Sequence, residues 1–179
     1  DIIAEDHRAA QVIQRLGALF KRSEPRLEPV CLATLVNDTL ELAGGLLSAR
    51  SIRVERALAP RLPSVLGDRV QLQQLLLNLV VNAVEAMDSV PEGQRVLTIG
   101  TDQRDHGTCL YVADRGPGVS PLAATSVFEA FWSTKDSGMG IGLALCRTIA
   151  QAHGGSLEVS AAAGGGALFL AQFPPGDAA

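Results

Sequence analysis

Residues 68–88, DRVQLQQLLLNLVVNAVEAMD, constrain the fold more than any other stretch of this chain. They contain neither glycine nor proline, and Asp68 stands where an N-cap residue accepts the first backbone N–H groups, so the sequence predicts one long helix. Asn78, Asn82 and Glu85 interrupt its Leu and Val residues at spacings of four and three, which places all three on one side of the helix. One amide alone is most simply a core residue with a hydrogen-bond partner. Three polar groups together form an oxygen-rich ridge of the kind that binds Mg²⁺ together with phosphates and water.

A second motif consists of alternate glycines, Gly138, Gly140 and Gly142, between a polar loop and the apolar run LALCRTIAQAH. Such glycines can expose successive backbone N–H groups and a helix N-terminus to phosphate oxygens. A Walker loop is excluded because no Gly-Lys-Ser/Thr follows, and a Rossmann loop because no βαβ unit with a terminal acidic residue surrounds the glycines. A flexible hinge explains an isolated glycine repeat equally well. The polar ridge elsewhere in the chain favours the anion site.

A third motif, DRGPG at residues 114–118, follows an apolar strand. An ionised Asp114 at the end of that strand can accept a hydrogen bond from an exocyclic amine, while Gly116 and Gly118 let backbone approach a flat ligand closely. Taken alone, an Asp-x-Gly sequence is more often an ordinary turn. Its functional interpretation depends on the two motifs around it.

The remaining hydrophobic pattern predicts an α+β fold. Apolar residues make up 47% of the chain and aromatic residues 4%, so the core must consist mainly of Leu, Val, Ile and Ala. Such a core suits a two-layer α/β sandwich, with a mixed sheet and helices on one face. Strands are predicted over residues 52–58, 96–101, 109–116, 156–161 and 167–173, and further helices over residues 34–49 and 141–153.

One isolated long helix is predicted to precede this fold. Residues 2–20 place Ile, Val, Leu and Phe side chains on a single helical stripe, and the two prolines within residues 23–29 end that helix. We therefore expect a separate helical segment over residues 1–24 and a globular domain over residues 25–179.

The net charge and the cysteine pattern argue against several classes of partner and site. A net charge of −4 gives no electrostatic reason to expect nucleic acid or an anionic membrane as the partner. Cys31, Cys109 and Cys146 show no C-x-x-C spacing, so we predict three small buried residues in a reducing compartment rather than a zinc site or disulfides. No stretch reaches the ~18 consecutive apolar residues of a membrane span.

Together these motifs resemble the ATP-binding catalytic domain of sensor histidine kinases, whose Bergerat fold is shared with gyrase, Hsp90 and MutL. Five motifs occur in the family's order over roughly residues 68–170. The sequences GMGIGLALC and STK are most similar to those of the oxygen-sensing, PAS-linked group. NLVVNAVEAM resembles the N box, DRGPG the G1 box, VFEAFWSTK the F box, GMGIGLALCRTIAQAHGG the G2 box and GGGALF the last glycine motif.

The resemblance implies ATP and Mg²⁺ as cofactors and assigns roles to residues. Asn82 is the implied Mg²⁺ ligand, Asn78 its neighbour on the phosphate side, and Asp114 the partner of the adenine amine. The implied nucleotide-binding set also includes Gly116 and Gly118 at the base, and Gly138, Met139, Gly140, Gly142 and Leu143 where the end of the lid faces the phosphates. Lys135 either reaches a phosphate or is a solvated loop residue, and Glu85 either contacts a metal-bound water or is a surface carboxylate.

One position separates kinases from ATPases of this fold. The ATPases carry a glutamate as general base one helical turn before the metal-binding asparagine, and this chain has Asn78 there. Because an amide cannot take a proton from water, phosphoryl transfer to a protein is favoured over hydrolysis. A gyrase-type ATPase is the less favoured reading, and a non-catalytic, nucleotide-gated interaction module stays open as the main alternative.

The phosphoacceptor of the family is missing. His7, His106 and His153 all lack the His-[Glu/Asp]-x-x-x-Pro setting, and residues 1–24 resemble the second helix of the dimerisation hairpin. The resemblance therefore implies a fragment of a cytoplasmic kinase module whose parent is either soluble or membrane-anchored. Its implied partners are the absent acceptor helix and a response regulator, without nucleic acid or direct membrane contact. The resemblance implies that the full-length protein is a homodimer, whereas the fragment can be a monomer.

Overall fold

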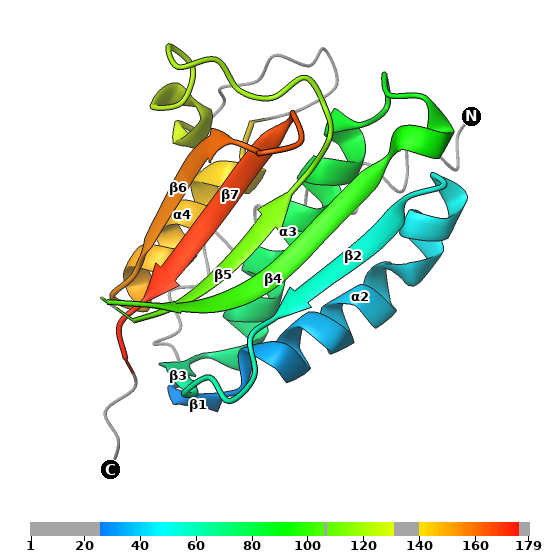
Figure 1. The fold of residues 1–179 in the computed structure, drawn as a ribbon. Coiled ribbons are helices and arrows are strands. Elements are labelled where there is room, and N and C mark those ends of the chain that lie inside the picture. The colour runs from blue at the N-terminus through cyan, green and yellow to red at the C-terminus, as the bar shows by residue number, and fades with distance from the viewer. Residues whose placement is uncertain (1–25, 106, 131–139, 176–179) are drawn as a thin grey trace, which may run out of the picture.

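The computed structural model describes residues 26–105, 107–130 and 140–175. Within these ranges the chain forms two layers, a five-stranded sheet and three α-helices on one of its faces (Figure 1). The helices are α2 (Leu32–Ala49), α3 (Arg69–Ala86) and α4 (Gly142–Ala152), and the sheet contains β2 (Arg53–Leu58), β4 (Val96–Arg104), β5 (Gly107–Ala113), β6 (Ser156–Ala161) and β7 (Ala167–Phe173). The predicted α+β sandwich is confirmed. The helix predicted over residues 1–24 lies outside the described residues.

The sheet is mixed, as predicted. Its strand order is β2-β4-β5-β7-β6, in which β2 and β4 run parallel and every other neighbouring pair is antiparallel. A separate two-stranded ribbon, β1 (Glu28–Val30) with β3 (Val65–Gly67), joins the start of α2 to the start of α3. The sequence analysis missed this ribbon, because three-residue strands give too short an alternation to recognise. Two 3₁₀ turns, Glu92–Gln94 and Ser126–Phe128, complete the described elements.

Helix α3 is the centre of the core. Its buried residues recur at helical spacing and face the sheet on one side and the other two helices on the others. Asp68 caps it as predicted, because its Oδ1 accepts hydrogen bonds from the N–H groups of Val70 at 3.0 Å and Gln71 at 3.1 Å. The fully buried leucines of α3 each contribute about 1.5–3 kcal/mol of hydrophobic free energy. They are Leu72, Leu75, Leu76 and Leu79.

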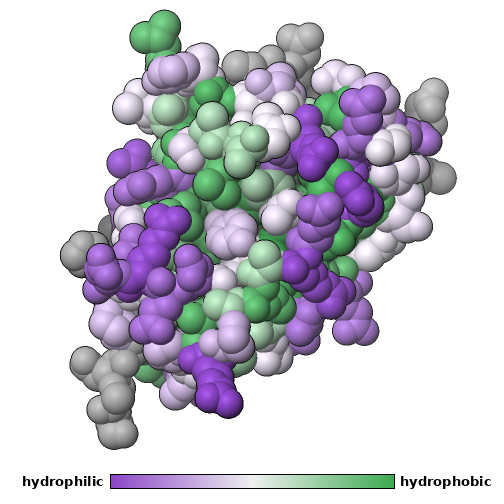
Figure 2. Space-filling model, in the orientation of Figure 1, coloured by the Kyte–Doolittle hydropathy of each residue, from purple (hydrophilic) through white to green (hydrophobic). Residues whose placement is uncertain are grey.

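The sheet face away from the helices packs differently. Tyr111 lies over Gly100 on the neighbouring strand, where an added Cβ would come within 2.2 Å of the ring's Cζ. Leu170 follows Tyr111 in the same cross-strand row and is half-buried. Figure 2 shows hydrophilic residues on both flanks of this face with less polar ones between them. The main hydrophobic cluster, which includes Leu110 and Val112 of β5, lies between the sheet and the helices.

One prediction about the cysteines is wrong. Cys109 and Cys146 are buried, and burial raises the pKa of the Cys109 thiol. Cys31 is exposed because it is the N-cap residue of α2, where the chain leaves the core. Hydrogen bonds from the backbone and side chain of Thr34 lower the pKa of the Cys31 thiol. In the described part of the chain, no helix is long and apolar enough to cross a membrane.

Arg95 links the C-terminal ends of α2 and α3. Its replacement gives a first testable prediction. Its guanidinium donates hydrogen bonds to the carbonyl oxygens of Val90 at 2.7 Å, Arg50 at 2.9 Å and Asp88 at 3.3 Å. Arg95→Met should lower the free energy of unfolding by about 1–2 kcal/mol, because all three hydrogen bonds are lost. Urea denaturation measures this. Arg53→Met is the control, since the Arg53–Glu55 pair is 66% and 46% exposed and should contribute almost nothing. Equal effects of the two changes would contradict the role of Arg95.

Candidate functional site

The polar ridge of α3 exists, but its three members differ in exposure. Asn78 and Asn82 are half-buried, and Glu85 is exposed near the helix end. The Nδ2 atom of Asn78 is buried and makes no hydrogen bond to any described residue. Leaving a buried N–H donor unsatisfied costs about 1–3 kcal/mol. A bound molecule that supplies an acceptor to this amide would remove the cost.

Asp114 is held rigidly at the end of β5. The side chain is 2% exposed, and its Oδ1 accepts hydrogen bonds from the N–H groups of Gly116 at 2.8 Å and Ala167 at 3.3 Å. The Asp114 N–H in turn donates to the carbonyl oxygen of Ala167 at 3.0 Å. These two backbone N–H groups hold the Asp114 carboxylate in place through Oδ1.

The glycine turn before β7 makes this arrangement possible. Gly166 has a φ of +86°, and a Cβ there would lie 2.1 Å from the carbonyl oxygen of Asp114. Only glycine adopts this backbone without strain and allows the close approach. The turn is part of the last glycine motif in the sequence, but neither Gly166 nor Ala167 was among the predicted site residues. The run of three glycines before an apolar strand was the available signal.

Gly116 and Gly118 were expected to let backbone approach a flat ligand, but their close contacts are with other parts of this chain. A Cβ on Gly116 would lie 2.6 Å from the carbonyl oxygen of Ala86, the last residue of α3, and one on Gly118 would lie 3.0 Å from that of Gly166. The close contacts are thus with the protein's own backbone. They pack DRGPG between the end of α3 and the glycine turn, which brings Asp114 beside the helix that carries the ridge.

The first turn of α4 has no side-chain cap among the described residues. Helix α4 begins at Gly142 after Ile141, which provides no side-chain cap, and no acidic residue occupies the first turn. Leu145 makes the first backbone bond of the helix, to the Ile141 carbonyl at 2.9 Å, so the geometry leaves the N–H groups of Gly142, Leu143 and Ala144 without acceptors inside the helix. Gly140 has a φ of +63°. Lys135, Gly138 and Met139 lie outside the described residues.

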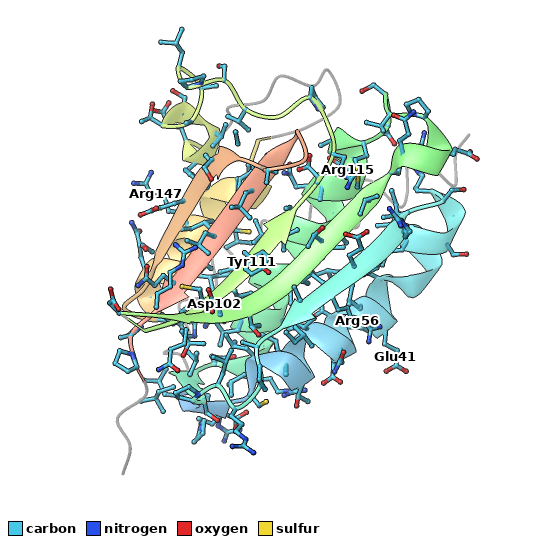
Figure 3. All side chains as sticks on the ribbon, in the orientation of Figure 1. Glu41, Arg56, Asp102, Tyr111, Arg115 and Arg147 are labelled. Carbon is cyan, nitrogen blue, oxygen red and sulfur yellow. The ribbon has the colours of Figure 1, made fainter. Side chains whose placement is uncertain are left out.

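Contacts between α3 and α4 bring the three motifs to one end of the domain. The start of α3 bonds to the end of α4, where the Asp68 N–H donates to His153 Nε2 at 2.9 Å. Midway along, the Cys146 thiol donates to the Leu75 carbonyl at 3.5 Å. The helices are therefore antiparallel, and the half of α3 that bears Asn78 and Asn82 lies toward the start of α4. Figure 3 shows Arg115, next to Asp114, at this same end of the sheet, whereas Asp102 lies at the opposite end.

The residues present suit Mg²⁺ only together with a phosphate ligand. Across the described ranges, no three His, Cys, Asp or Glu side chains gather into a metal site. Mg²⁺ commonly binds through one or two protein oxygens and completes its coordination with substrate phosphates and water. The Asn82 amide, one helical turn from the buried Asn78 donor, can supply one such oxygen.

The chain belongs to the family described as histidine kinase-, DNA gyrase B-, and HSP90-like ATPase, whose model matches residues 67–177. Within the family it is an ATP-binding catalytic domain of the sensor histidine kinase type, as the five motifs predicted. It is 35% identical over 171 residues to the C4-dicarboxylate transport sensor protein DctS of Rhodobacter capsulatus, covering 96% of this chain and 26% of DctS. It is 37% identical to the sensor protein FixL of Bradyrhizobium diazoefficiens, covering 95% of this chain and 34% of FixL.

Solved structures agree with this assignment. Full-length ShkA in complex with AMPPNP is similar with a TM-score of 0.77 and 31% identity, over 94% of this chain and 35% of ShkA. The nucleotide-free catalytic domain of histidine kinase ThkA is similar with a TM-score of 0.74 and 26% identity, over 84% of this chain and 96% of that domain. This chain spans about a third or less of the sensor proteins named above.

Proposed function

We propose that this domain binds ATP with Mg²⁺ and donates the γ-phosphoryl group to a histidine outside the fragment. The observation that carries the proposal is the buried Asn78 amide, which lacks an acceptor among the described residues and lies on the same ridge as Asn82. A phosphate oxygen supplies the missing acceptor. The uncapped first turn of α4 supplies further N–H donors for the same phosphates.

The base of the nucleotide is recognised at Asp114. The exocyclic amine of adenine donates to the Asp114 carboxylate, which the N–H groups of Gly116 and Ala167 hold through Oδ1. The fixed carboxylate distinguishes an amine from a carbonyl at that position of the base, since an ionised carboxylate only accepts hydrogen bonds.

The phosphates lie between the ridge and α4 in this proposal. Asn78 Nδ2 donates to a phosphate oxygen, and the Asn82 amide oxygen holds Mg²⁺, which neutralises charge on the phosphates during transfer. Gly140, Gly142 and Leu143 line the phosphate side in this proposal. Gly138, Met139 and Lys135 lie outside the described residues and stay predictions from the resemblance, with Lys135 either reaching a phosphate or being a solvated loop residue. Glu85 keeps its two predicted roles, as a contact to metal-bound water or as a surface carboxylate.

Transfer to a protein is favoured over hydrolysis because Asn78 is an amide and cannot serve as general base toward water. The chain's task is then to hold nucleotide and acceptor in line, which is the main protein contribution in phosphoryl transfer. The γ-phosphorus leaves ADP and forms its new bond to an imidazole nitrogen of the acceptor.

A transfer assay in trans tests the proposal. The chain is incubated with γ-labelled ATP and a separate polypeptide that carries a His-[Glu/Asp]-x-x-x-Pro helix. We expect acid-labile, base-stable label on that histidine, and none when the histidine is replaced by glutamine. ADP binding without any transfer would favour the nucleotide-gated interaction module instead. Rapid steady-state release of inorganic phosphate would favour a gyrase-type ATPase.

The remaining expectations concern the parent protein. We infer that residues 1–24 are the second hairpin helix, that the parent is a homodimer, and that a response regulator is the downstream partner in the cytoplasm, where ATP is available. Histidine kinase ThkA has been solved in complex with response regulator protein TrrA, and it shares this fold with a TM-score of 0.79 and 21% identity.

Gly142 provides a prediction that separates nucleotide binding from stability. A Cβ at Gly142 would meet no atom of the described residues within 4 Å, and alanine favours a helix more than glycine by up to about 1 kcal/mol. Gly142→Ala should therefore preserve or raise the melting temperature. It should also weaken ADP binding about tenfold, because the methyl group occupies space that the phosphates approach. Calorimetric titration measures the affinity. Unchanged affinity in a folded variant would move the phosphates away from the start of α4.

A further inference from the structure

His153 occupies a fully hydrogen-bonded position at the end of α4. The side chain is 6% exposed, its Nδ1 lies 2.7 Å from the carbonyl oxygen of Ile149, and its Nε2 lies 2.9 Å from the backbone nitrogen of Asp68. A carbonyl only accepts and a backbone N–H only donates. Nε2 therefore accepts and Nδ1 donates, so both ring nitrogens bond to backbone.

Asp68 extends this contact to the chain that leads into the domain. Its Oδ1 caps α3, while its Oδ2 accepts a hydrogen bond from the Arg26 N–H at 3.0 Å. Burial alone would raise the pKa of the Asp68 carboxyl, but the backbone N–H groups of Arg26, Gln71 and Val70 outweigh it and lower the pKa. We call the pair Asp68 and His153 the staple.

The surroundings of the ring are shaped to hold it. A Cβ on Gly67 would lie 2.8 Å from His153 Cδ2 and 2.7 Å from Leu72 Cδ1, so only glycine leaves room for the ring. On another side, Phe173 packs edge-to-face with a centroid separation of 6.4 Å and an interplanar angle of 83°. The ring therefore has little freedom to rotate away from its two partners.

The staple lies at the opposite end of the helix pair from the proposed nucleotide site. Asn82 follows Asp68 by 14 residues, which at ~1.5 Å per residue is about 21 Å along α3. A tilt of ~3° between the helices at the staple would thus move the ridge by about 1 Å relative to the start of α4. A displacement of ~1 Å in an active site can reduce catalysis about 100-fold.

We propose that His153 is a positioning residue for the nucleotide site, which holds the start of α3 to the end of α4 and so fixes the separation of Asn78 and Asn82 from the start of α4. This inference rests on the proposed nucleotide function. Because Asp68 also binds the Arg26 N–H, the staple ties the segment before β1 to the same helix pair. A displacement of that segment would thus reach α3 through Asp68, beside the pairing of Glu28 with Gly67.

Two variants, each with a neutral amide at position 153, distinguish the positioning role from simple capping of α4. In His153→Gln, the side-chain carbonyl can accept the Asp68 N–H, which keeps the bond between the helices. In His153→Asn, the shorter amide can donate to Ile149 but does not reach Asp68, which keeps only the bond within α4. We expect the Asn variant to bind ADP about five- to tenfold more weakly than the Gln variant, the range of one lost hydrogen bond. A capping role predicts the reverse order or no difference.

A separate variant serves as the control for a change in stability alone. Val36 is fully buried in α2, and Val36→Ala should lower the melting temperature without changing the affinity for ADP. Gly67→Ala is a second test, because its methyl group displaces the ring while all hydrogen-bonding groups remain, and it should weaken ADP binding as His153→Asn does. The proposal is overturned if the Gln and Asn variants bind ADP equally, or if affinity follows melting temperature across all variants, Val36→Ala included. Absence of ADP binding in the unmodified chain would instead overturn the proposed function, and the positioning role with it.

Discussion

Replacing Asp114 with asparagine is expected to weaken ADP binding by about 10- to 100-fold while the domain stays folded. The asparagine carbonyl can still accept the Gly116 and Ala167 N–H groups, so the loop retains its support. Its NH₂ group, however, replaces the oxygen that accepts the adenine amine and faces it with another donor. A lost hydrogen bond to a charged group has about this effect on affinity.

The same variant should change which base the site prefers. Hypoxanthine carries a carbonyl where adenine carries the amine, so the ratio of ADP to IDP affinity should fall in Asp114→Asn. Titration calorimetry with both nucleotides measures the ratio. Asp102→Asn is the matched control, because Asp102 is an exposed carboxylate at the other end of the sheet (Figure 3). A variant that loses ADP and IDP affinity equally would mean that Asp114 supports the loop without contacting the base.

Removing the Asn82 amide should have the largest effect on phosphoryl transfer. Asn82→Ala is expected to slow transfer to the acceptor histidine by about 100- to 1,000-fold, the usual range for losing one group that stabilises charge in a transition state. The side chain is only half-buried, so the fold should survive the truncation. The labelled transfer assay gives the rate, and ADP titration with and without Mg²⁺ shows whether metal dependence disappears.

An asparagine outside the site serves as the control for that change. Asn37 on α2 accepts a hydrogen bond from Arg56 at 3.2 Å, and Asn37→Ala should leave transfer unchanged. If Asn82→Ala transfers phosphate at the original rate and keeps its Mg²⁺ dependence, the metal lies elsewhere.

The sequence predicts most of the fold because its elements are long and strongly patterned. Helix α3 was located within two residues at each end, since Asp68 is a strong cap and the helix has no internal breaker. The ribbon of β1 and β3 was missed because its pairing joins residues far apart in the chain, as Val30 with Val65. Such contacts leave no local signal.

The sequence predicts which chemical groups belong to the candidate site, but not how they are arranged in space. Asp114 was identified from a strand followed by Asp-x-Gly, yet its support by Ala167 depends on a strand more than fifty residues later. The role of Gly116 was assigned to ligand approach, whereas the structure fills the space beside it with the end of α3. The contact of His153 with Asp68 was not predicted, because it spans 85 positions and no spacing rule detects it.

The most direct test of a nucleotide site between α3, Asp114 and α4 is calorimetric titration of ADP into the unmodified chain, first with Mg²⁺ and then with EDTA. We predict binding with one nucleotide per chain in the presence of Mg²⁺, and a clear loss of affinity when EDTA removes the metal. No heat of binding with Mg²⁺, or an affinity that EDTA leaves unchanged, would contradict the proposal that Asn82 and the phosphates share a metal ion.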